Sequence, residues 1–209
     1  MGLVYQIGYW ASRFLANTCF NYRVIGRERI PQHGGLILAM NHESFMDPPL
    51  AGISSEREVY YFARKSLLDW PVLGGLFPKM RVIPFDQTKT DLSALKTAVR
   101  VVEAGNGVVM FPEGTRTRDG RMGQAQPGVG FVVARTGAPV LPMRIFGAYR
   151  AFPPESRAIR FEDVTVVVGD LIRFSPEEVR AVGKDAYQWV SDRVMDRIRA
   201  LELPESPAA

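Results

Sequence analysis

The sequence is poor in the side chains that build disulfides and zinc sites. Its 209 residues include one cysteine and two histidines. A lone cysteine, Cys19, cannot form an internal disulfide, which excludes a disulfide-stapled secreted fold and favours a reducing compartment. A zinc site of histidine and cysteine would need almost all of these side chains, and their spacing fits no metal motif. We therefore expect no metal centre.

The sequence also lacks an apolar run long enough to cross a bilayer, which takes roughly 20 predominantly apolar residues. Residues 1–20 come nearest but are interrupted by polar side chains, and they lack the basic start and the cleavage site of a secretory signal. Their large apolar side chains recur at helical spacing, on Leu3, Ile7, Trp10, Phe14 and Leu15. This pattern predicts an amphipathic helix. It either lies at a membrane interface, as its aromatic residues favour, or packs this face on the core.

The remaining composition is that of a globular protein, with 46% apolar and 23% charged residues. We expect residues 21–203 to form a single domain. Apolar strand-like runs alternate with helical patterns, which predicts an α/β fold with a mixed, largely parallel sheet flanked by helices. The net charge of +4 suits an anionic membrane or a phosphorylated substrate. Nucleic acid is not an expected partner, because no nucleic-acid-binding motif occurs.

The most informative segment follows an apolar run at residues 35–40, which we interpret as a buried strand. It reads N-H-E-S-F-M-D-P-P and starts at Asn41. Asp47 followed by Pro48 is typical of a helix start, with the aspartate as the N-cap. The turn can fold the Asp47 carboxylate onto the imidazole of His42, which would orient the histidine as a general base. The alternative is that Asp47 only caps the helix and His42 is an ordinary loop residue.

No G-x-S-x-G segment supplies a serine nucleophile, and Ser44 is poorly placed to serve His42 on so tight a turn. The simplest chemistry is a base that acts directly on a substrate hydroxyl. A second polar turn, F-P-E-G-T-R from Phe111 to Arg116, follows another apolar run. Together, N-H-x-x-x-x-D and F-P-E-G-T-R resemble the glycerolipid acyltransferase family, which includes 1-acylglycerol-3-phosphate acyltransferases. Residues 65–74 and 138–142 resemble two further family segments, so that the resemblance covers roughly residues 20–175.

The resemblance implies an O-acyltransferase. It would move a fatty acyl group from acyl-CoA or acyl carrier protein to the free sn-2 hydroxyl of 1-acylglycerol-3-phosphate, giving phosphatidic acid. It implies His42 as base and Asp47 as its partner, with no metal and no bound cofactor. The residues implied to bind the acceptor phosphate and substrate are Lys65, Glu113, Gly114, Thr115 and Arg116. The protein would sit at the cytoplasmic face of the cell membrane as a peripheral or monotopic protein.

One departure concerns the acceptor. Many family members carry an arginine where this chain has Gln87, which cannot neutralise a phosphate. Arg81 or Lys89 compensates, or the acceptor is another lyso-lipid, such as a lyso-ornithine lipid. The basic pair formed by Arg64 and Lys65 is a natural phosphate-binding element or else a solvated strand end.

Several alternatives remain open. Glu113 either bonds a substrate hydroxyl, orients Arg116, or forms a structural ion pair with Arg116 or Arg118. Residues 66–80 form the wall of an acyl channel, part of the core or a membrane contact. The whole protein could instead be a non-catalytic lipid-binding module or a hydrolase. Two further expectations concern the fold: Pro142 marks an edge strand or a bulge, and one closing helix begins at Pro176.

Overall fold

A seven-stranded sheet forms the centre of the protein, with the strand order β1-β7-β6-β2-β5-β3-β4. The computed structural model describes residues 2–69, 73–86, 91–156 and 158–204. Every pair of neighbouring strands is parallel except β6 and β7. The predicted mixed, largely parallel α/β sheet is therefore confirmed. The strands are β1 Arg23–Ile25, β2 Leu36–Met40, β3 Val59–Arg64, β4 Val82–Phe85, β5 Gly107–Met110, β6 Val140–Phe146 and β7 Thr165–Val168.

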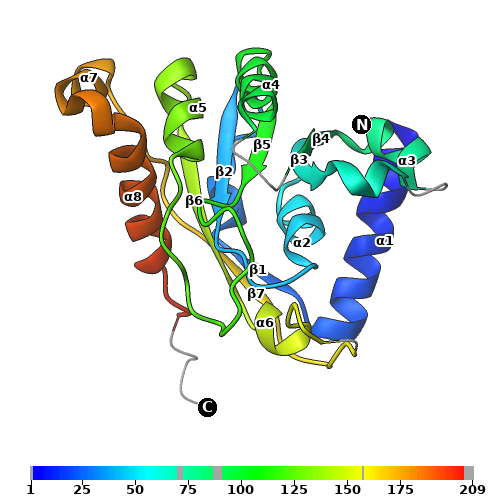
Figure 1. Ribbon diagram of the computed structural model, residues 1–209. Helices are drawn as coiled ribbons and strands as arrows, with labels where there is room; N and C mark the ends of the chain where they lie inside the picture. The colour runs from blue at the N-terminus through cyan, green and yellow to red at the C-terminus, as the bar shows by residue number, and fades with distance from the viewer. Residues whose placement is uncertain (1, 70–72, 87–90, 157, 205–209) are drawn as a thin grey trace.

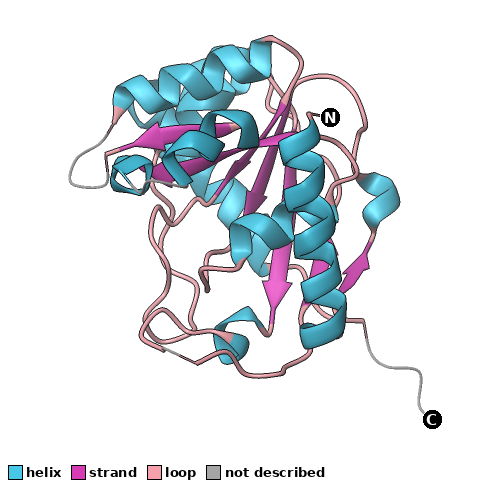
Figure 2. Cartoon of the chain, turned by 90° about the vertical axis from the view of Figure 1, so that its right-hand side faces the viewer, coloured by secondary structure: helices cyan, strands magenta, loops and turns pink. Residues whose placement is uncertain are grey.

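Helices cover both faces of this sheet (Figures 1 and 2). One face packs against α1, α2 and α6, and the other against α4, α5 and α8. All five residues of β2 are buried, as expected for a strand covered on both sides, whose sequence is continuously apolar rather than alternating. The helices are α1 Leu3–Phe20, α2 Asp47–Ser54, α3 Leu73–Leu76, α4 Leu92–Glu103, α5 Gly128–Thr136, α6 Ala148–Ala151, α7 Pro176–Val182 and α8 Ala186–Arg199.

The sheet brings the two polar turns of the sequence together. β2 and β5 are parallel neighbours, with Ala39 opposite Met110, so that both strands end at the same edge. The backbone N–H of Thr117, in the second turn, donates to the carbonyl oxygen of His42 at 2.9 Å. Open α/β sheets bind ligands beyond the carboxyl ends of their strands, and this edge is therefore where a site is expected.

The helix α1 exposes the face that the sequence marks as apolar. It packs on the core with Tyr5, Ala16 and Phe20 instead. The five side chains predicted to share one face are between 55% and 74% exposed: Leu3, Ile7, Trp10, Phe14 and Leu15. The interpretation in which this face packs on the core is therefore wrong. Within the described part of the chain, no helix has the length and apolar character needed to cross a membrane.

Two local predictions need correction. The expected continuous helix from Pro176 is broken, because Gly183 adopts a left-handed φ of +74° and a 3-10 turn separates α7 from α8. Pro142 does not lie on an edge strand, since β6 runs between β7 and β2. Between the pairs Met143–Val168 and Val140–Ile172, two residues of β6 face three of the partner segment. The extra residue therefore lies in segment 169–171, opposite the strand that contains Pro142 and not within it.

Candidate active site

A largely apolar cavity of about 750 Å³ lies at the edge where the two polar turns meet. Four of the predicted site residues line it: His42, Gly114, Thr115 and Arg116. The other lining residues are mostly apolar and come from helices and strands far apart in sequence, among them Tyr5, Tyr9, Ile53, Val82, Phe85 and Leu95. Of the segment 66–80, Ser66, Leu67 and Met80 line the cavity, in agreement with a channel wall, whereas residues 70–72 lie outside the described residues.

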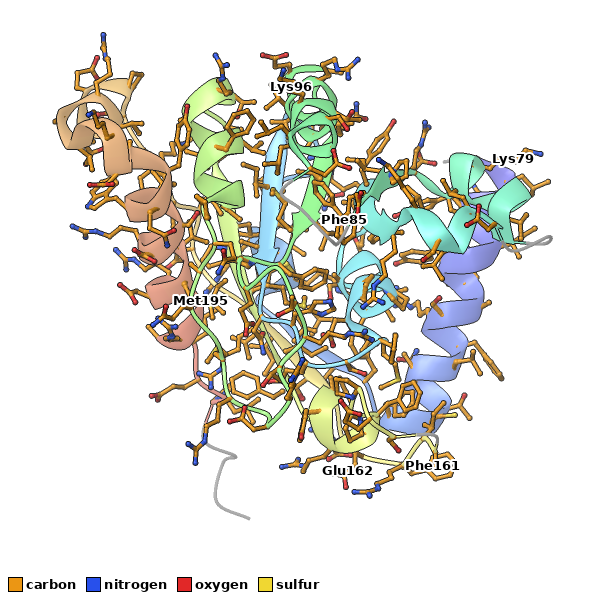
Figure 3. All side chains as sticks on the ribbon, in the orientation of Figure 1. Lys79, Phe85, Lys96, Phe161, Glu162 and Met195 are labelled. Carbon is orange, nitrogen blue, oxygen red and sulfur yellow. The ribbon has the colours of Figure 1, made fainter. Side chains whose placement is uncertain are left out.

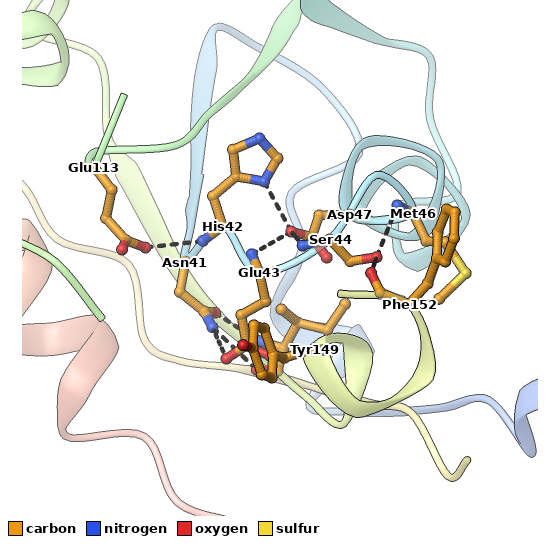
Figure 4. A network of polar contacts seen from close by, with 10 residues as sticks. Asn41, His42, Glu43, Ser44, Met46, Asp47, Glu113, Tyr149 and Phe152 are labelled. Carbon is orange, nitrogen blue, oxygen red and sulfur yellow. Dashed lines mark hydrogen bonds and ion pairs between the residues drawn. The ribbon is translucent and has the colours of Figure 1, made fainter. Parts of the chain in front are cut away.

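His42 and Asp47 form a hydrogen-bonded pair beside the cavity (Figure 4). The imidazole Nδ1 lies 2.8 Å from Asp47 Oδ2. Because a carboxylate only accepts, Nδ1 carries the proton and Nε2 keeps its lone pair. Asp47 is fully buried, whereas the His42 side chain is 16% exposed and lines the cavity. The pair therefore has the geometry of a general base and its orienting carboxylate.

The sequence placed Asp47 one position too early in the helix. Met46 holds the N-cap position, and Asp47 is the first residue of α2. Its Oδ2 atom turns back and also accepts the backbone N–H groups of Glu43 and Ser44, at 2.5 and 2.7 Å. The short turn between histidine and aspartate is thus wrapped around the carboxylate, which holds it in the orientation that His42 requires.

The imidazole ring is held from a second side by the other turn. Phe111 stacks on it with ring centroids 4.0 Å apart and an interplanar angle of 16°. The backbone N–H of His42 donates to Glu113 Oε1 at 2.8 Å. Both contacts come from a segment about 70 positions further along the chain, so that packing of β2 beside β5 completes the orientation of the imidazole.

Glu113 joins the two turns through its carboxylate. Its Oε2 accepts the N–H of Gly123 at 2.7 Å while Oε1 accepts that of His42. Burial raises the pKa of this carboxyl group, an effect that the two hydrogen bonds oppose. Within the described residues it forms no ion pair with Arg116 or Arg118. Glu113 is not among the residues that line this cavity, and its predicted contact with substrate stays a prediction.

Asn41 and Glu43 anchor the first turn to the sheet. The buried Asn41 side chain exchanges two hydrogen bonds with the backbone of Ile145 in β6, and its Nδ2 also donates to Glu43 Oε1 at 2.9 Å. Burial, followed by the charge of Asp47, raises the pKa of Glu43 to about 7. The sequence had no signal for this titration, since it depends on what encloses the side chain.

Arg116 lines the cavity and lies over the ring of Phe45, which lines it too. Its guanidinium carbon is 3.4 Å from the ring centroid of Phe45. Its Nη1 atom is buried and has no hydrogen-bond partner among the described residues. Burial, followed by the charge of Arg64, lowers the Arg116 pKa. A buried charged donor without an acceptor is unfavourable, so this is where an anionic ligand group fits. Phe45, in the first turn, was not identified as functional from the sequence.

The predicted phosphate residues do not all face the cavity. Lys65 is absent from the lining, and its Nζ lies 3.1 Å from Asp91 Oδ2. Its neighbour Arg64, the last residue of β3, does line the cavity. The role proposed for Lys65 by resemblance stays a prediction. The sequence offered the basic pair as a whole but could not tell which of the two side chains faces the site.

The structure tests one of the two cations expected to compensate for Gln87. Arg81, one of two cations expected to compensate, binds Glu58 at 2.9 Å and Tyr60 at 3.2 Å and is not among the cavity residues. Gln87 and Lys89 lie outside the described residues. Within the described part of the chain, no group of three or more His, Cys, Asp or Glu side chains is placed to hold a metal ion.

Comparison with known proteins agrees with this site. A sequence model of the family described as Acyltransferase matches residues 21–146. The chain belongs to this acyltransferase family. The acyltransferase is 32% identical over 148 residues to the chloroplastic 1-acyl-sn-glycerol-3-phosphate acyltransferase BAT2 of Brassica napus, a match that covers 68% of this chain and 42% of that protein. It is 26% identical to a Pseudomonas aeruginosa 1-acyl-sn-glycerol-3-phosphate acyltransferase, covering 90% of this chain and 73% of the relative.

A solved structure supports the fold of the acyltransferase. The crystal structure of the 1-acyl-sn-glycerophosphate (LPA) acyltransferase PlsC from Thermotoga maritima superposes with a TM-score of 0.71 at 24% sequence identity. The match covers 96% of this chain and 80% of that one. The acyltransferase spans less than half the length of the first two curated relatives, covering 42% and 46% of them.

Proposed function

We propose that the protein is a 1-acylglycerol-3-phosphate O-acyltransferase. It transfers a fatty acyl group from the thioester of acyl-CoA or acyl carrier protein to the free sn-2 hydroxyl of the acceptor, which gives phosphatidic acid. The observation that carries the proposal is the position of His42, whose oriented imidazole lines a cavity with mostly apolar walls and two arginines, Arg64 and Arg116. A lysophosphatidate has the same division between an acyl chain and a phosphate. The names of the relatives support the same activity.

The reaction uses His42 as a proton carrier. Its Nε2 takes the proton of the acceptor hydroxyl while the hydroxyl oxygen attacks the thioester carbonyl carbon, and a tetrahedral oxyanion forms. Collapse of the oxyanion breaks the C–S bond, and the leaving thiolate takes the proton from the imidazolium. Asp47 stabilises the imidazolium between these two transfers. A positioned base of this kind contributes about 10²- to 10⁴-fold to the rate.

A transfer assay with purified protein in detergent tests the proposal. The substrates are labelled palmitoyl-thioester and 1-acylglycerol-3-phosphate, and wild type is compared with His42→Ala. We expect phosphatidic acid from wild type and almost none from the variant. Equal turnover by a folded His42→Ala protein would contradict the mechanism. Acylation of other lyso-lipids alone would identify a different acceptor, free fatty acid without acceptor a hydrolase, and no transfer a binding module.

The same proposal includes a place at the membrane, where the lysophospholipid acceptor and the phosphatidic acid product reside. We propose that α1 lies on the cytoplasmic face of the cell membrane with its exposed apolar side in the interface. Ile159 and Phe161 are exposed as well, and Phe161 lies close to the C-terminal end of α1 (Figure 3). The chain is tied there, because Asn21 Nδ2 donates to Asp163 Oδ1 at 3.2 Å. The net charge of +4 favours anionic lipids.

Vesicle sedimentation tests this orientation. We expect a Trp10→Ser, Phe14→Ser double variant to bind anionic vesicles much more weakly than wild type, because burial of each such side chain contributes about 1.5–3 kcal/mol. Phe161→Ser alone should have a smaller effect in the same direction. Unchanged sedimentation of the double variant would contradict the membrane role of α1, and its melting temperature controls for folding.

A further inference from the structure

We propose that the loop of residues 117–126, which leads from the turn after β5 to α5, binds the phosphate groups of a coenzyme A thioester. Arg118 and Arg121 are the cations that contact them. The inference rests on the proposed function, because it names where the water-soluble half of the acyl donor lies. Neither arginine lines the cavity that contains His42, so this site is separate from the one that holds the acceptor.

A second cavity, of about 310 Å³, adjoins the first. Thr115, Arg116 and Gln126 line both cavities, so that the two meet at the turn after β5. The first cavity has mostly apolar walls, whereas every side chain that lines the second is polar or charged. Its remaining lining residues are Glu113, Thr117, Arg118, Asp119, Arg121, Gly123 and Gln124. Small-molecule sites begin at about this size, and the walls suit a water-soluble, charged ligand.

The two cavities differ in the helices that they approach. Residues of α1 line the first, among them Tyr5 and Tyr9, and none lines the second. Figure 1 shows the loop after β5 beside α8, with α1 on the opposite side of the molecule. An acyl chain directed toward α1 therefore leaves the second cavity for the soluble half of its carrier. Since α1 is the helix proposed to lie on the membrane, this arrangement keeps the soluble half away from the bilayer.

Two helices hold the loop in place. On α8, the side chains of Arg199 and Gln188 donate to carbonyl oxygens of the loop at 2.6 and 2.8 Å. On α6, Tyr149 Oη donates to the carbonyl oxygen of Arg118 at 2.8 Å. These contacts fix the backbone on either side of Arg121 before a ligand arrives, which reduces the entropy that binding must remove.

The carboxylates of the second cavity are hydrogen-bonded, and two of its arginines are unpaired. Asp119 Oδ1 accepts the backbone N–H of Arg121 and the hydroxyl of Thr117, both at 3.0 Å, and these bonds lower the Asp119 pKa. Glu113 accepts two backbone N–H groups. Within the described residues, neither Arg118 nor Arg121 has an ion-pair partner. The loop therefore presents two guanidinium groups whose charge is free to bind an anion.

Coenzyme A carries the anions that such a pair selects. It has a diphosphate and a ribose phosphate monoester, and the monoester alone carries about −1.5 to −2 charges at pH 7. A guanidinium binds two phosphate oxygens with its planar fork. An acyl carrier protein presents the same pantetheine arm with only a single phosphate, so that two arginines on one loop favour coenzyme A.

A truncated donor tests the proposal. Arg118→Gln and Arg121→Gln are made singly and together, and Lys96→Gln removes an exposed cation from α4, away from both cavities (Figure 3). We expect each single variant to raise the KM for palmitoyl-CoA about two- to fivefold and the double variant about tenfold, at similar kcat. The KM for the palmitoyl thioester of N-acetylcysteamine, which has no phosphate, should not change. Lys96→Gln should leave both values at those of wild type.

Three results would overturn the proposal. The first is an equal rise in KM for both donors, which would mean that the arginines act on the fold or on the acceptor. The second is an unchanged KM for palmitoyl-CoA in the double variant. The third is a loss confined to a palmitoyl-acyl carrier protein donor, which would identify the loop as a contact for a protein.

Equilibrium binding separates this inference from the proposed function. Titration of coenzyme A into wild type and into the double variant requires no turnover. We expect about tenfold weaker binding by the double variant, with a smaller dependence on salt because fewer charges are screened. If wild type makes no phosphatidic acid, the proposed function has failed, yet this difference in binding would still support the site. Equal affinity would overturn it. Both arginines are exposed, so the melting temperature should stay nearly unchanged.

Discussion

The two turns at the active edge differ in which polar atoms they leave without a hydrogen-bond partner. In the turn after β2, Asp47 Oδ2 accepts three N–H groups and Asn41 is bonded on both sides of its amide. In the turn after β5, Arg116 rests on Phe45 and keeps a buried Nη1 without a partner among the described residues. Asp47 Oδ1 is also buried without a partner among the described residues. The atoms that orient His42 are nevertheless all hydrogen-bonded, whereas Nη1 of the cation Arg116 is not.

In the proposed mechanism, the first turn supplies the general base and the second turn supplies the cation that binds the substrate. A general base must hold its tautomer and direction before the substrate arrives, because reorganisation during the reaction would raise the barrier. A binding cation gains most when its charge is left unpaired until the substrate provides the counter-charge. Glu113 connects the two turns by accepting N–H groups of His42 and Gly123, so the orientation of the base depends on the binding turn.

The largest expected effect on turnover comes from substitutions of His42 and Asp47 in the turn after β2. We expect His42→Ala to lower kcat about 10²- to 10⁴-fold, the contribution of a positioned general base. Asp47→Asn should also lower kcat, because an amide nitrogen cannot accept from Nδ1 and the tautomer is lost. The acyl-transfer assay measures both. A folded Asp47→Asn protein with wild-type kcat would show that the carboxylate does not orient the base.

Removal of the link between the turns should affect stability and turnover together. Glu113→Ala deletes two hydrogen bonds to a carboxylate and leaves two N–H groups without their acceptor, so we expect a loss of about 2–4 kcal/mol in the free energy of unfolding. The kcat should fall because the backbone of His42 loses its anchor. Chemical denaturation and the transfer assay measure the two effects, and Glu113→Gln, which keeps one acceptor, should lie between. An Ala variant with lower stability but full kcat would show that the turns are not coupled.

The pH dependence of stability tests the raised pKa of Glu43 in the turn after β2. The pKa of Glu43 is about 7 in the fold against 4.5 for a free glutamate. Its contribution to stability is therefore fully present below about pH 4.5 and is lost as the pH rises through about 7. We expect wild type to lose about 2 kcal/mol more than Glu43→Gln between pH 5.5 and 8.5. Denaturation curves at both values measure this difference, and parallel losses in the two proteins would refute it.

The smallest effect is expected from Phe45, whose ring contacts Arg116 of the turn after β5. Phe45→Leu removes the ring beneath Arg116, a cation–π contact that contributes about 0.5–1 kcal/mol at an exposed site. We expect the acceptor KM to rise about two- to fivefold at unchanged kcat. Phe45→Tyr should retain the wild-type value, because it keeps an aromatic face. If Phe45→Leu instead lowered kcat alone, the ring would be supporting the base rather than the binding cation.

The sequence predicted the parts of the site that are local. His42 and Asp47 are five positions apart, and an apolar run followed by a polar turn marks a strand end wherever it occurs. The largely parallel sheet followed from the alternation of such runs with helical patterns. The closing helix was predicted less well, since one glycine with a left-handed φ divides it.

What the sequence by itself determined is the pairing of His42 with Asp47 and the strands that carry both turns, because these depend on contacts within a few residues. Only the tertiary structure decided that Glu113 bonds the backbone of His42 from 71 positions away, that Arg64 rather than Lys65 lines the cavity, and that α1 exposes its apolar face. The physical reason is that strand register and helix packing set which distant side chains meet. A periodic pattern defines the faces of a helix or strand, but what covers each face depends on the rest of the chain.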